Sequence, residues 1–233
     1  MAISYPTDIS NLALWLQARD LSTLFQNIAG STPVTADGQT VGTWNDKSGG
    51  GFNLTAPADD GQRPVFNVTA GVQWVTFDGT DAYLRRTADL GMYAAGAASV
   101  FVACRSATPG ISRYFVTSGD SATNNTLYVP MKTGNPTTTS LAVQIRNDAN
   151  TTLLLNESIQ TNAFDDNDNV VGFVDTGAGV TPWLDGTEGT EATYTRSGTL
   201  TPDRFALGAL LRAVASAWWP GRPSSTHGRL PER

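Results

Sequence analysis

The chain has 233 residues, a single cysteine and a formal net charge of −6, and only 15% of its residues are charged. An acidic chain repels phosphate backbones and anionic lipids, which argues against a nucleic-acid partner. The longest apolar run, residues 94–104, is too short to span a bilayer, which argues against membrane insertion.

The negative charge is unevenly distributed along the chain. Residues 1–211 hold 11 Lys and Arg against 20 Asp and Glu, whereas the last 22 residues hold four Arg and one Glu. We therefore expect one β-sandwich domain over residues 1–222 and an irregular basic tail over residues 223–233, produced by a shifted reading frame or by truncation. The first residues lack the basic start and apolar core of a signal peptide, so we expect the chain to fold in a cytoplasm.

Short apolar stretches separated by turn residues predict an all-β fold. Residues 141–146 (LAVQIR) place apolar side chains at every second position, as in a strand with one face in the core and one in water. Asp185 and Gly186 supply the residues that a tight hairpin turn requires. Strands are predicted at residues 13–17, 72–77, 99–104, 113–117, 127–131, 140–146, 151–156, 169–175, 179–184 and 204–211.

Four motifs in the first third of the chain carry a family resemblance. They are LWLQARDL (14–21), VGTWNDKSG (41–49), RPVF (63–66) and VTFDGTDAYL (75–84). Their order and spacing resemble the laminin-G-like branch of the concanavalin A-like lectin/glucanase superfamily, in particular modules of bacteriophage and bacterial surface proteins. The resemblance implies an antiparallel jelly-roll β-sandwich that binds a glycan or another protein, and it does not by itself imply an enzyme.

The residue types of a hydrolase are scarce. The glucanase branch of the superfamily places carboxylates at alternate positions of one strand, and no such pattern surrounds the four glutamates, which are Glu157, Glu188, Glu191 and Glu232. The only histidine, His227, lies in the basic tail, where it cannot be expected to serve a nucleophile or a zinc ion. We predict no catalytic residue, although a carboxylate pair assembled across strands stays open.

Cys104 lies in an apolar, strand-like run, which favours a buried structural thiol over a nucleophile.

Two Asp/Asn-rich stretches are candidates for calcium or ligand binding. One contains Asp165, Asp166 and Asp168, but Val170 and Thr176 stand where an EF-hand requires Gly and Glu. The other contains Asp120, Asn124 and Asn125, which could bind calcium or a ligand at the rim of the sandwich. Solvated turns in which Asx side chains bind their own backbone are the favoured alternative for both stretches. Calcium is the only cofactor that the sequence suggests.

The six tryptophans divide into two groups. Trp15, Trp44, Trp74 and Trp183 lie in or beside apolar strand patterns and are predicted to be core residues. The adjacent pair Trp218 and Trp219 would send one ring inward and one outward if the segment is extended. The outward ring would contact a protein interface or stack on a sugar.

These observations favour a non-enzymatic module of a virion surface, such as a decoration, head-fibre or tail-associated protein. Its expected partners are other virion proteins or further copies of itself, and a cell-surface glycan. Because the tail lacks the closing strand of the family, the predicted strand at residues 13–17 would have an open edge for attachment. A polysaccharide depolymerase and a free cytoplasmic lectin are the alternatives.

Overall fold

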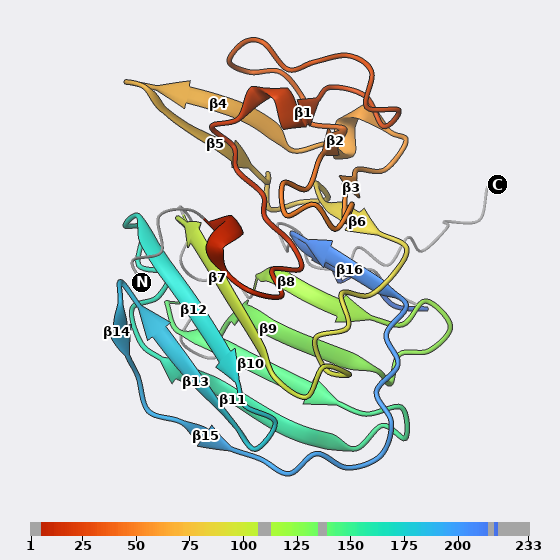
Figure 1. The fold of residues 1–233 in the computed structure, drawn as a ribbon, viewed down its shortest axis with the longest axis vertical. Coiled ribbons are helices and arrows are strands. Elements are labelled where there is room, and N and C mark those ends of the chain that lie inside the picture. Colours follow the sequence, from red (N-terminus) through yellow and green to blue (C-terminus); the bar gives the residue numbers. More distant parts are fainter. Residues whose placement is uncertain (1–5, 107–112, 135–138, 214–216, 219–233) are drawn as a thin grey trace, which may run out of the picture.

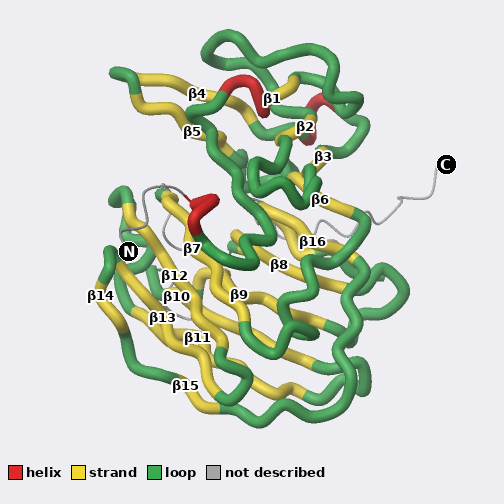
Figure 2. The backbone as a smooth tube through the Cα atoms, viewed as in Figure 1, coloured by secondary structure: helices red, strands yellow, loops and turns green. Residues whose placement is uncertain are grey.

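The computed structural model describes residues 6–106, 113–134, 139–213 and 217–218. In this part of the chain the predicted all-β fold is confirmed: antiparallel strands form two packed sheets, and the helical residues belong to three short 3₁₀ turns (Figures 1 and 2). These turns are η1 (Pro6–Asp8), η2 (Leu21–Thr23) and η3 (Asp60–Gln62). Residues 223–233, the predicted basic tail, lie outside the described residues.

The larger sheet has nine strands in the order β1-β2-β3-β6-β16-β8-β9-β10-β11. They are β1 (Leu24–Phe25), β2 (Thr43–Trp44), β3 (Leu54–Thr55), β6 (Leu84–Arg86), β16 (Arg204–Leu207), β8 (Tyr114–Gly119), β9 (Leu127–Thr133), β10 (Leu141–Arg146) and β11 (Thr152–Gln160).

The second sheet has the order β14-β13-β12-β7, with β15 also pairing with β13. Its strands are β7 (Ala98–Cys104), β12 (Asn169–Asp175), β13 (Gly179–Leu184), β14 (Thr187–Glu188) and β15 (Ala192–Thr193). Two further strand pairs are not hydrogen-bonded as strands into these sheets. They are the hairpin of β4 (Val65–Thr69) with β5 (Val72–Thr76), and the pair of β17 (Ala209–Leu210) with β18 (Ala217–Trp218).

Alternating apolar residues from both sheets form the core. Leu141, Val143 and Ile145 of β10 are buried and belong to the same apolar cluster as Val171 and Phe173 of β12. A strand with one wet face exposes every second side chain, as β7 does, whereas β9 is buried along its whole length. The Asp185-Gly186 hairpin is also confirmed, because both residues have positive φ (50° and 80°) and join β13 to β14.

Two expectations from the sequence are wrong. Residues 13–17 form no strand. Their backbone is bound by residues 46–48 instead: the amide of Trp15 donates to Oδ1 of Asp46 at 2.9 Å, and the carbonyl of Trp15 accepts from the amide of Lys47 at 2.9 Å. The chain's own residues therefore cover this segment, and the proposed open edge at residues 13–17 is not there.

The second error concerns the predicted core tryptophans. Trp44 is buried, whereas Trp15 and Trp183 are half-buried and Trp74 is 39% exposed. Side chains alternate along β5, but alternation in the sequence does not say which of the two faces meets the core. Val75 packs on the core, and Trp74 faces outward.

Candidate functional site

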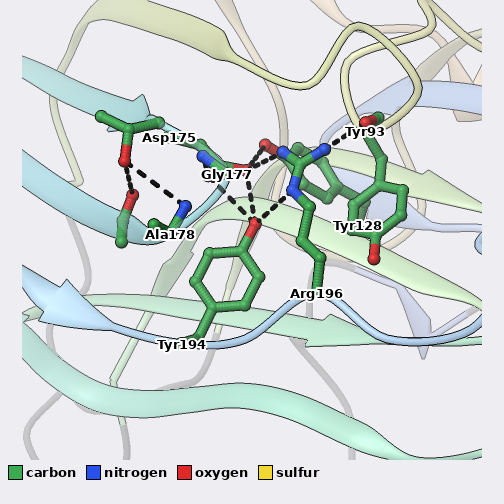
Figure 3. Close-up of polar contacts among 9 residues, drawn as sticks. Tyr93, Tyr128, Asp175, Gly177, Ala178, Tyr194 and Arg196 are labelled. Carbon is green, nitrogen blue, oxygen red and sulfur yellow. Dashed lines mark hydrogen bonds and ion pairs between the residues drawn. The ribbon is translucent and has the colours of Figure 1, made fainter.

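A buried polar cluster around Asp175 links the two sheets (Figure 3). Asp175 ends β12, and its side chain is fully buried. Its Oδ2 accepts from the hydroxyl of Tyr128 on β9 at 2.8 Å, and both of its oxygens lie within 3.0 Å of the Tyr194 hydroxyl. Its Oδ1 also accepts from the amide of Gly177 at 2.7 Å.

Arg196 completes this cluster. Its Nη2 lies 2.8 Å from Oδ2 of Asp175, its Nε donates to the Tyr194 hydroxyl at 3.0 Å, and its guanidinium lies 4.3 Å from the centre of the Tyr93 ring. Burial raises the pKa of the Tyr128 and Tyr194 hydroxyls, and the charge on Asp175 raises both further. Both phenols therefore stay protonated as donors, and both carboxylate oxygens are filled by internal donors. The arrangement ties the sheets together and leaves Asp175 no lone pair positioned to take a substrate proton.

The structure places Asp120, Asn124 and Asn125 in one loop at the end of β8. The Asp120 carboxylate accepts from the amide of Ala122 at 2.7 Å, as in an Asx turn. The carbonyls of Asn124 and Asn125 both accept from the guanidinium of Arg146, and Arg212 lies 3.5 Å from the Asn124 carbonyl. Two positive side chains thus lie against the carbonyl oxygens of this loop, which disfavours calcium binding there electrostatically.

The other predicted cluster forms the turn between β11 and β12. Asp165 accepts from the side chains of Asn167 and Asn169, each at 3.0 Å, and Asp166 forms an ion pair with Arg105 at 3.2 Å. Asp168 is exposed on the same turn. Among the described residues, no three His, Cys, Asp or Glu side chains come together in a way that could hold a metal ion.

The glutamates do not share a strand face. Glu157 on β11 forms an ion pair with Lys132 on β9 at 2.6 Å. Glu188 stands opposite Trp183 in the β13–β14 hairpin, and the side chain of Glu191 lies against Gly179. Trp218 pairs with Ala209 through the backbone of β18, while Trp219, His227 and Glu232 lie outside the described residues.

An aromatic row on the outer face of the second sheet was not predicted. Phe101 on β7, Gly172 on β12 and Trp183 on β13 stand directly opposite one another, and Glu188 on β14 extends the row. Residues in register on adjacent strands share a sheet face. This face points away from the core, because Phe101 is 56% exposed whereas Val171 and Phe173 are buried.

Gly172 brings the two aromatic residues together. A Cβ atom at Gly172 would lie 2.5 Å from Cε1 of Phe101 and 2.8 Å from Cβ of Trp183, so the Phe101 ring lies directly over the glycine. Ser99 and Thr181 flank this row on one side, with Val174 between them, and the exposed residues Ala103 and Val170 flank it on the other. An exposed aromatic side chain with hydroxyl groups beside it is a candidate for ligand binding. We name Phe101, Gly172, Trp183 and Glu188 the aromatic row.

Comparisons with protein-family models, with curated proteins and with solved structures found no match for this chain. Within the described residues, none of the helical segments has the length and apolar character needed to cross a membrane.

Proposed function

We propose that this protein is a non-catalytic module of a bacteriophage particle surface and that it binds glycans through the aromatic row. The observation that carries the glycan part is the exposed Phe101 ring over Gly172 beside Trp183, with Glu188, Ser99 and Thr181 on the same sheet face. Aromatic side chains offer a large apolar face to the C–H side of a sugar ring, and the neighbouring carboxylate and hydroxyls can bind the sugar hydroxyls.

The particle part of the proposal is supported by the four motifs between residues 14 and 84 that resemble phage and bacterial surface modules. The structure also shows how two of these motifs contact each other. In the second motif, Asp46 accepts from the backbone amides of Trp15 and Phe52, which joins the first motif to the loop after β2.

A glycan array probed with the full chain tests the binding site. We expect a subset of glycans to bind, and Phe101→Ala to lower that affinity by about tenfold, equivalent to roughly 1.4 kcal/mol. Leu155→Ala is the matched control, because Leu155 is a similarly exposed apolar residue (51%) on β11 of the other sheet. Equal binding by Phe101→Ala and the wild-type chain would remove the aromatic row as the site.

Two further measurements separate the alternatives. Mass spectrometry of purified particles from a lysate should detect the chain, and its absence from particles would favour a free lectin. Incubation with host capsular polysaccharide should release no reducing sugar, and release would favour a depolymerase.

A further inference from the structure

The β4–β5 hairpin forms a sheet of its own and projects from the rest of the molecule (Figures 1 and 2). Ala70 and Gly71 form its two-residue turn, with φ values of 51° and 83°. Such values suit the type I′ turn of a regular hairpin. No other strand of the described chain pairs with β5, so β5 is a free edge.

One face of β5 carries exposed apolar side chains. Val72 is 64% exposed and Trp74 is 39% exposed, whereas Val75 packs on the core from the opposite face. The indole of Trp74 is held in place, because its Nε1 donates to Oγ1 of Thr76 at 3.0 Å. The side chain of Asn67 on β4 donates to the same oxygen at 3.0 Å.

The backbone of β4 shows which groups β5 presents at its edge. The amide of Phe66 donates to the carbonyl of Gln39 at 2.8 Å, and the amide of Val68 donates to Asp37 at 2.7 Å. These two residues therefore point their backbone groups away from β5, and their partners across the hairpin, Val75 and Gln73, point theirs to the other side. The amide and carbonyl groups of Gln73 and Val75 thus line the free edge.

This edge lacks the features that usually prevent strand addition, namely charged side chains, proline and bulges. No charged residue lies between Arg63 and Asp78, the register of the hairpin has no shift, and β5 contains no proline. The edges at β11 and β14 do have such features: the register of β11 with β10 is shifted twice, and β14 has two residues, one of them Glu188.

We infer that two copies of this chain associate by antiparallel pairing of β5 with β5, around a two-fold axis at Trp74. In that register Gln73 of each copy exchanges hydrogen bonds with Val75 of the other, so all four edge groups are satisfied. Trp74 then faces its own counterpart as a non-hydrogen-bonded pair, the closer of the two pair types.

The uncharged and self-complementary edge of β5 favours a second copy as the occupant. The chain carries a net charge of −6, so two copies repel each other through most of their surface. The hairpin is neutral over its whole length, and its edge is self-complementary under the two-fold axis. A single pair of five-residue strands is smaller than a standard interface of roughly 1,600 Å², so we expect a weak dimer that assembly on a particle would reinforce.

Analytical ultracentrifugation of the full chain over a concentration series tests the association. We expect a monomer–dimer equilibrium, and Trp74→Lys should raise its dissociation constant by about tenfold or more, because two lysines would then face each other. Thr69→Lys is the matched control: Thr69 lies exposed on the same hairpin face, but on β4. Monomer at all concentrations would overturn the inference. An equal effect of Trp74→Lys and Thr69→Lys on the dissociation constant would overturn it as well.

Cysteine trapping tests the register independently of stability, in a Cys104→Ala background. We expect Trp74→Cys to form a disulfide-linked dimer on mild oxidation. Val72→Cys should not, because the two copies of Val72 would be about 13 Å apart along the strand, beyond disulfide reach. Equal trapping of both variants would contradict the register. Among the described strands, β7 is another uncharged edge; dimerisation abolished by Phe101→Lys but not by Trp74→Lys would show association through that strand instead.

Discussion

The hydroxyl of Tyr128 donates a 2.8 Å hydrogen bond to Oδ2 of Asp175, and this bond joins β9 of the larger sheet to β12 of the second sheet. Both residues are buried, and the Tyr128 ring lies edge-on to Phe173 with ring centres 5.9 Å apart. A sandwich has no backbone hydrogen bonds between its layers, so side-chain bonds of this kind fix how the layers face each other. Arg196 extends the tie to the loop after β15.

We expect Tyr128→Phe to lower the free energy of unfolding by about 1–3 kcal/mol, because it removes one buried donor. Asp175→Ala should cost about 3–5 kcal/mol, because it leaves Arg196 and two phenols without their acceptor. Urea unfolding followed by tryptophan fluorescence measures both. Asp168→Ala is the control, since exposed Asp168 should change stability by less than about 0.5 kcal/mol. Similar losses from the two Asp variants would contradict the structural role of Asp175.

Asp46 predicts an acid dependence of stability. Burial raises the pKa of its carboxyl, but hydrogen bonds from Ser48, Trp15 and Phe52 outweigh burial and hold this pKa below its usual value. A carboxyl whose pKa is lower in the folded state than in the unfolded state, where it is near 3.9, stabilises the fold at a pH above that value. This stabilisation is lost as the pH falls through the pKa of the folded state.

Asp46→Asn should therefore be less stable than the wild-type chain at pH 7, and the difference should shrink as the pH falls below about 4. Urea unfolding at pH 7, 5, 4 and 3 measures this difference. A difference that stays constant over this range would show that the charge on Asp46 does not contribute.

Strands that carry both a periodic pattern and clear turns were predictable. Residues 169–175 and 179–184 have the predicted bounds, because both are runs of strand-forming residues and the Asp185-Gly186 turn ends the second. Residues 13–17 are a short apolar run as well, yet their amide and carbonyl groups bind residues 46–48 rather than a neighbouring strand. An apolar run indicates which side chains are buried, and it does not identify the partner of the backbone.

The candidate site could not be predicted because it depends on register. Phe101, Gly172 and Trp183 come from three strands, and a shift by one residue in either pairing would separate them. The cluster around Asp175 has the same origin, since Tyr194 and Arg196 follow β15 in a segment without a periodic pattern. The Asp and Asn runs were visible in the sequence, but their arginine partners were not.

Cys104 should be an unreactive thiol in the folded chain. Burial raises its pKa to about 12, and the nearby charge of Asp185 adds to this. At pH 8 about one thiol in ten thousand would then be a thiolate, which is the nucleophilic form. We expect slow modification by iodoacetamide under native conditions and rapid modification in 8 M urea, measured by intact mass. Rapid native modification would contradict the effect of burial on this thiol.

Two glycine substitutions separate turn strain from contacts on the sheet face. Gly186→Ala should cost about 1–2 kcal/mol, because the residue has a φ of 80° and its Cβ would meet no atom within 4 Å. Gly172→Ala should cost about 1–3 kcal/mol for a different reason, since its Cβ would displace the Phe101 ring and press on Trp183. Unfolding alone cannot tell these costs apart, but glycan binding can. Only Gly172→Ala places a new atom against Phe101 and Trp183, so it should weaken binding more than Gly186→Ala does. Equal effects on binding would mean that overall stability, rather than the seating of Phe101, controls affinity.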